Sequence, residues 1–146
     1  KIKSLRSFSV GHSQVTEAGV RFFAGHPQLK EFSIAEMASH RVTGKALGAI
    51  AEIPHLTRVG FKECYVTYDG GFALLAPLKG QLAEIDLTMS VASQRDLDKL
   101  QADHSQAKIV TIPPAEIVKR HKFIAANLAK QAPAELAAPL KEALAK

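Results

Sequence analysis

The chain has 146 residues, of which 47% are hydrophobic, and this is enough to bury the core of one ordinary domain. No segment approaches the run of roughly eighteen apolar residues that a membrane-spanning helix needs, and residues 1–13 lack the apolar stretch of a signal peptide, so the sequence predicts a water-soluble chain without a membrane span. The net charge of +5 is not strongly concentrated and the basic residues lack interleaved aromatic side chains, so nucleic acid is not an expected partner.

Five short segments share one apolar spacing and predict five strands. Apolar residues stand at the first, fourth and sixth places of each segment. The segments contain Leu5, Phe8 and Val10; Leu29, Phe32 and Ile34; Leu56, Val59 and Phe61; Leu82, Ile85 and Leu87; and, more weakly, Ala107, Val110 and Ile112. Their first residues lie 24, 27, 26 and 25 residues apart, so the chain consists of four repeats and a terminal strand.

The segments between these strands predict short helices. A hydroxyl side chain stands just before each helical part, where it can accept a free backbone N–H: Thr16, Thr43, Thr67 and Ser93. Ser93 and Asp96 also resemble a capping box. Proline cannot continue a helix, so Pro27, Pro54 and Pro77 predict helix ends. The second copy has three extra residues, which fall within residues 36–41.

Neither the strand nor the helix of one copy can bury its apolar side alone. Stacking the copies about 4.8 Å apart aligns the strands as a parallel sheet and seals the apolar residues between the sheet and the helices. We therefore expect an α/β fold with one buried row containing Leu5, Leu29, Leu56 and Leu82. The next buried row should contain Phe8, Phe32, Val59 and Ile85.

The stretch VTEAGVRFFAGHPQLKEFSI, residues 15–34, resembles the leucine-rich repeats of bacterial proteins and of the cysteine-containing subfamily. Those families combine a V-T-D-x-G-L start, an L-x-x-L-P-x-L middle and an L-x-L strand. The resemblance covers about residues 2–112 and implies a right-handed solenoid of residues 1–112, with parallel strands on the concave face and helices on the convex face. The usual Asn of the ninth place is replaced by Ser13, Cys64 and Ser90, so a ladder of Asn hydrogen bonds is not expected.

Few side chains of the sequence are candidates for catalysis or metal binding. Cys64 is the one cysteine, so it forms no internal disulfide, and its place in the repeat predicts a buried thiol. No histidine falls in an HExxH or Ser/His/Asp context, and His26 and His55 beside their prolines are expected at the surface. Stacking brings His12, Glu36 and Glu63 together at the eighth place, and imidazole and carboxylate groups can bind a divalent metal. The alternative interpretation of the chain is a metal-dependent or enzymatic activity, located in this column or in a neighbouring domain outside this sequence.

Residues 113–146 follow a different pattern. Ile117, His121, Ile124 and Leu128 recur at helical spacing, and Leu136, Leu140 and Leu144 form a second stripe that Pro139 interrupts. The segment predicts a helical cap for the last repeat, because an uncapped solenoid end exposes apolar surface. The alternatives are a linker to another domain or a basic amphipathic helix for a membrane surface or an acidic partner.

The exposed places of the strands predict the binding surface. The family resemblance favours a non-catalytic recognition module, without cofactor or metal, that binds a protein through its concave sheet face. The expected ligand-binding residues are Glu31, Ser33, Arg58, Lys62, Glu84, Asp86 and Thr88. Ser7, Glu31, Arg58 and Glu84 share the third place and alternate in sign along the row. Because Lys1 stands only four residues before Leu5, we also expect the chain to be part of a longer protein.

Overall fold

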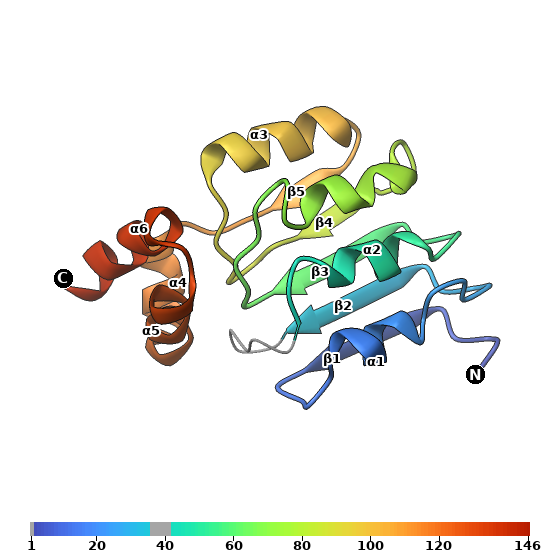
Figure 1. The fold of residues 1–146 in the computed structure, drawn as a ribbon, viewed down its shortest axis with the longest axis horizontal. Coiled ribbons are helices and arrows are strands. Elements are labelled where there is room, and N and C mark those ends of the chain that lie inside the picture. Colours follow the sequence, from blue (N-terminus) through green and yellow to red (C-terminus); the bar gives the residue numbers. More distant parts are fainter. Residues whose placement is uncertain (1, 36–41) are drawn as a thin grey trace.

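A computed structural model describes residues 2–35 and 42–146 of the chain (Figure 1). Strands and helices alternate in the first part: β1 (Ser7–Gly11), α1 (Glu17–Arg21), β2 (Glu31–Ala35), α2 (Ala46–Ala51), β3 (Arg58–Lys62), the 3-10 helix η1 (Phe72–Leu78), β4 (Glu84–Asp86), α3 (Gln94–Asp103) and β5 (Lys108–Val110). Three helices follow: α4 (Pro114–Arg120), α5 (Lys122–Gln131) and α6 (Ala134–Leu144). Over these described ranges, no helix combines the length and the apolar character needed to cross a membrane.

The strands form one parallel sheet in the order β1-β2-β3-β4-β5, so each strand lies beside its neighbours in the chain. The helical segments α1, α2, η1 and α3 follow one another along one face of this sheet (Figure 1). The mixed α/β class with a parallel sheet is therefore confirmed. The opposite face of the sheet carries the exposed strand side chains.

The predicted rows are confirmed for the first four strands. Phe8, Phe32, Val59 and Ile85 stand opposite one another in the register. Leu29, Leu56 and Leu82 are at most 3% exposed. Leu5 and Phe8 are only half-buried, because β1 has a neighbouring strand on one side alone among the described residues.

The register of the fifth strand was predicted wrongly. Ile85 pairs with Ile109, one residue before the predicted Val110. The backbone N–H of Lys108 donates to the carbonyl oxygen of Ala83 at 2.9 Å, as the N–H of Glu84 donates to Thr57 one copy earlier at 3.3 Å. Lys108 therefore belongs to the third-place row, next to Glu84.

The four predicted hydroxyl groups accept backbone N–H groups at the starts of the helical parts. Thr16 accepts from Gly19, Thr43 from Lys45, Thr67 from Gly70 and Ser93 from Asp96, at 3.0 to 3.3 Å. Pro27 and Pro54 follow α1 and α2 as expected, whereas Pro77 lies inside η1 and does not end it. It is the sixth of the seven residues of η1, and because it has no N–H this short helix lacks one i→i−3 hydrogen bond there.

The turns after the strands also repeat. The eighth-place residues His12, Glu63 and Met89 all adopt the left-handed conformation, with φ of 52°, 60° and 66°. At the ninth place, Cys64 is 4% exposed, so its predicted burial is confirmed. Ser90 joins two copies: its hydroxyl donates to the carbonyl oxygen of Phe61 at 2.8 Å and accepts the N–H of Cys64 at 3.1 Å. A serine hydroxyl thus links two neighbouring turns at the place where the resembling families have Asn.

The C-terminal helices pack on the turns that follow the strands. Ile117, Ile124, Leu128 and Leu140 form a second buried cluster, which also includes Val91 and touches Tyr65, Met89 and Ile112. In Figure 1, α4, α5 and α6 lie beyond the carboxyl ends of the strands. The predicted helical stripe is interrupted at His121, which ends α4, precedes α5 and is exposed. Pro139 lies inside α6.

Candidate recognition surface

The exposed face of the sheet contains a shallow hollow of about 270 Å³, which we call the sheet-face hollow. Side chains alternate between the two faces of a strand, so the third, fifth and seventh places point away from the core. Six of the seven predicted binding residues line the hollow: Glu31, Ser33, Arg58, Lys62, Glu84 and Asp86. Thr88 does not line it, because it follows the end of β4, where its N–H donates to Oδ1 of Asp86 at 2.9 Å.

The third-place row forms one wall of the hollow. Arg58 Nη1 lies 3.3 Å from Glu31 Oε1, and the hydroxyl of Ser7 donates to the other carboxylate oxygen of Glu31 at 3.2 Å. Glu84 stands between Arg58 and Lys108 in the register. The Arg58 and Glu31 side chains are 58% and 45% exposed, so solvent screens their ion pair to less than about 1 kcal/mol.

A second ion pair lies deeper on the same face. Lys62 Nζ lies 2.6 Å from Asp86 Oδ2, and the two side chains are 33% and 23% exposed. Burial alone would raise the pKa of Asp86, but hydrogen bonds from Lys62 and Thr88 and the charge of Lys62 outweigh it and lower that pKa below its ordinary value. Asp86 is therefore ionised at neutral pH, and this end of the hollow holds a fixed pair of opposite charges.

The middle of the hollow is shaped by Gly60. A Cβ atom at this position would lie 2.4 Å from Ser33 Oγ and 2.9 Å from Ser33 Cβ. The serine side chain thus occupies the space above the glycine, and the register places both residues in one row with Ser9 and Asp86. The sequence analysis did not identify this steric role of Gly60. It also missed Lys108, because the register of β5 was wrong.

The structure brings together two members of the eighth-place column. His12 Nε2 lies 3.2 and 3.1 Å from the two carboxylate oxygens of Glu63, a residue that is only 8% exposed. Glu36 lies outside the described residues. Within residues 2–35 and 42–146, no group of three or more His, Cys, Asp and Glu side chains is arranged to hold a metal ion.

A cluster on the helix side was not predicted. The Tyr68 hydroxyl donates to Asp103, and Lys79 Nζ lies 2.6 Å from the same carboxylate. The hydrogen bond to Asp103 raises the pKa of Tyr68, and the hydrogen bonds from Lys79 and Tyr68 lower the pKa of Asp103. These contacts connect the turn before η1, the residue that follows η1 and the end of α3, which is a structural role.

Two histidines are buried, and one of them, His26, was expected at the surface. His26 is 2% exposed: its Nδ1 accepts the N–H of Gln28 at 3.4 Å, and its Nε2 donates to the carbonyl oxygen of Ile2 at 3.0 Å. His104 is also 2% exposed, and neither ring nitrogen has a hydrogen-bond partner among the described residues. Burial lowers the pKa of His104, so its ring is neutral at neutral pH. His55 is exposed, as expected.

No protein-family model matches the chain, and no curated protein is significantly similar to it.

Proposed function

We propose that the chain is a non-catalytic recognition module of the leucine-rich-repeat type, which binds a protein partner through the sheet-face hollow. The observation that carries the proposal is that side chains from four neighbouring strands line one shallow surface. The exposed groups are charged or small, with Arg58 and Lys62 among Glu31, Glu84 and Asp86. Such a surface suits a polar protein interface of modest affinity better than a deep apolar pocket for a small molecule.

The solenoid part of the proposal is supported by the repetition of small features. The strands keep the order of the chain, and a hydroxyl group accepts a backbone N–H at or shortly before the start of each helical part. The left-handed residue recurs at the eighth place of three copies. A single repeated unit of strand, turn and helix accounts for all three, because each unit buries its apolar side only against its neighbours.

Reversing the central charge tests the proposed surface. The change Arg58→Glu places three carboxylates in one row, so it should weaken capture of the partner at least tenfold through like-charge repulsion at the interface. Stability should change by less than about 1 kcal/mol, because the lost ion pair is exposed. The measurement compares what wild-type and variant protein capture from the native source, with melting temperatures as a check on folding.

Arg21→Glu is the matched control for this experiment. Arg21 is equally exposed and pairs with Glu52 at 3.6 Å on the helix side, away from the hollow. Partners that bind through the sheet face should be retained by Arg21→Glu and lost by Arg58→Glu. Equal recovery of the same partners by both variants would exclude the sheet face and direct the search to the helices.

The second candidate function is metal-dependent or enzymatic, and the contact of His12 with Glu63 favours it. In this interpretation the pair provides two ligands, or a general base whose ring the carboxylate orients. Protein purified, loaded with Zn²⁺ and dialysed should then keep about one equivalent of metal, and both His12→Ala and Glu63→Gln should abolish retention. Retention below a tenth of an equivalent in the wild-type protein would rule out a zinc site here.

A further inference from the structure

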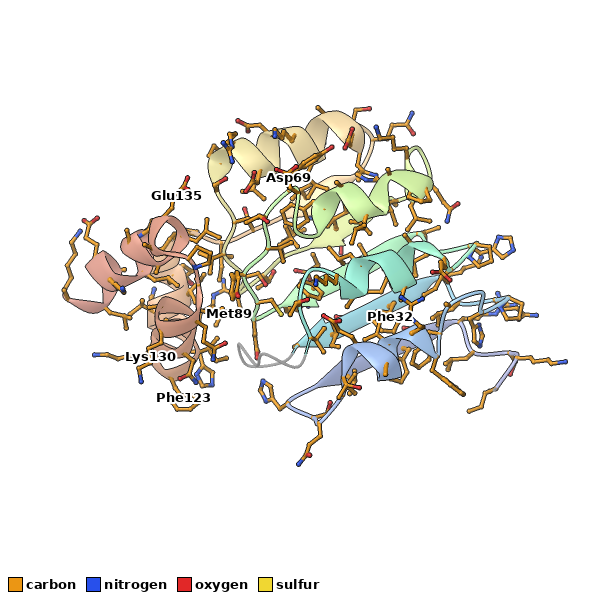
Figure 2. All side chains as sticks on the ribbon, in the orientation of Figure 1. Phe32, Asp69, Met89, Phe123, Lys130 and Glu135 are labelled. Atoms are coloured by element: carbon orange, nitrogen blue, oxygen red, sulfur yellow. The ribbon has the colours of Figure 1, made fainter. Side chains whose placement is uncertain are left out.

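A cavity of about 360 Å³ lies where the repeats meet the C-terminal helices, and we call it the junction cavity. Two segments bound it: residues 87–97, which run from the end of β4 into α3, and residues 111–117, which connect β5 to α4. Met89, labelled in Figure 2, lies in this junction and packs against the C-terminal cluster. Pockets that bind small molecules have volumes of roughly 300 to 1,000 Å³, and the junction cavity falls in this range.

The junction cavity exists in part because the fourth copy has a smaller side chain than the other three at one place. The residue just before each hydroxyl cap is valine in the first three copies and alanine in the fourth: Val15, Val42, Val66 and Ala92. Val42 and Val66 are each 2% exposed and belong to the core. Ala92 lacks the two γ-methyl groups of valine, so space that valine fills in the earlier copies is open here.

The path of the chain after β5 keeps this space open. The turn of the third copy is covered by that of the fourth, because Tyr65 pairs with Val91. Continuing the register of β4 and β5 along the chain sets residue 115 opposite Val91 in the same way. Residue 115 lies inside α4, which begins at Pro114. The start of a helix therefore replaces the turn of a fifth copy, and the cavity lies beside Ala92 at this point.

The junction cavity has an apolar inner wall and an uncharged rim. The inner wall consists of side chains that are at most 2% exposed: Val66, Phe72, Leu87 and Ile117. The exposed residues Gln94, Thr111 and Pro113 form the rim. None of the side chains that line the cavity is charged. A charged group that entered it would lose its hydration without gaining an ionic partner, so the lining favours an uncharged molecule.

We propose that the junction cavity binds a small, uncharged and mostly apolar molecule. An apolar cavity of about 150 Å³ can hold benzene, so this larger one has room for a molecule of roughly two rings. The hydroxyl of Thr111 and the amide of Gln94 can form a hydrogen bond with one polar group of that molecule at the rim. This proposal does not depend on the sheet-face hollow, which lies on the exposed face of the sheet.

A matched pair of fluorescent probes tests the proposal on the full chain. N-phenyl-1-naphthylamine is neutral, and 8-anilinonaphthalene-1-sulfonate has the same rings with one negative charge. Ala92→Leu fills the cavity, and Ala92→Val restores the residue of the other copies. Ala102→Leu is the control, because it adds the same atoms at an exposed position of α3 that does not line the cavity. Circular dichroism shows which variants are folded.

The neutral probe should bind wild type and Ala102→Leu alike. It should bind Ala92→Leu at least tenfold more weakly and Ala92→Val at least threefold more weakly, because the added methyl groups occupy its space. The neutral probe should also raise the melting temperature of the wild type but not that of Ala92→Leu. The sulfonate should give the same signal with wild type and Ala92→Leu, because its charge keeps it out of the cavity.

Undiminished binding of the neutral probe to either folded Ala92 variant would overturn the proposal, and so would the absence of binding to wild type. If Ala92→Leu does not fold, Ala92→Val decides. A sulfonate signal that Ala92→Leu abolishes would show that the cavity accepts an anion, which contradicts the proposed ligand class. A dimer of the wild-type chain that Ala92→Leu dissociates would assign the cavity to a second copy and would also refute the proposal.

Discussion

Replacing Leu56 with alanine is expected to lower the free energy of unfolding by about 2 to 5 kcal/mol. Leu56 is completely buried and precedes β3, the central strand of the sheet. Leu29 and Leu82 occupy the same row in the neighbouring copies, so the cavity left by the shortened side chain removes contacts from both. Urea denaturation, followed by circular dichroism, measures the loss as a lower midpoint at an unchanged slope.

Leu74→Ala is the control for that experiment. It removes the same atoms from a side chain in η1 that is 40% exposed. The free energy of unfolding should therefore fall by less than half as much as in Leu56→Ala. If Leu56→Ala leaves the midpoint unchanged, the assignment of Leu56 to the buried row is wrong.

The substitution Gly44→Ala is expected to lower the free energy of unfolding by about 1 to 3 kcal/mol, because there is no space for the added methyl group. A Cβ at Gly44 would lie 2.5 Å from the carbonyl oxygen of Gly70 and 3.0 Å from Cα of Gly71. These are backbone atoms, so no side chain can rotate away, and the segments before α2 and η1 would have to separate. Thermal denaturation should show the loss as a melting temperature several degrees lower.

Gly48→Ala, only four residues further on, is the matched control. Its Cβ would meet only Leu74 Cδ1, at an ordinary 3.6 Å, and the position lies inside α2. Alanine favours a helix over glycine by about 1 kcal/mol, so this variant should be as stable as the wild type or more stable. Equal melting temperatures for the two variants would mean that the backbones at Gly44 and Gly70 are further apart than the structure places them.

The buried rows could be predicted from sequence because each depends on the spacing of apolar residues within one short strand. The same rule failed at the fifth strand. Ile109, Val110 and Ile112 are all apolar and close together, so the apolar spacing is compatible with more than one register. The pairing Ile85 to Ile109 is decided by the length of the turn after α3, which apolar spacing does not encode. The burial of His26 and His104 could not be predicted either, because both residues lie in turns, where the sequence has no regular apolar spacing. Their burial depends on the segments that pack against these turns.

The sheet-face residues were predictable for the same reason as the core. If alternate places point inward, the remaining places point outward, so six of the predicted residues line one hollow. The exception, Thr88, follows the end of β4, which has only three residues, and strand length was not visible in the sequence. The contact of His12 with Glu63 followed from their shared place in the repeat, whereas the steric role of Gly60 depends on the rotamer of Ser33.

The two edge strands of the sheet differ in length, because β1 has five residues and β5 has three. A parallel sheet whose two edges are both open can add further chains head to tail without limit and grow into fibres. Here β5 has only three residues, Lys108–Val110, and residues 111–113 belong to no strand, so a further strand could pair with only a few backbone groups. That edge therefore offers a further strand little backbone to pair with, and the described residues do not extend the sheet beyond β5.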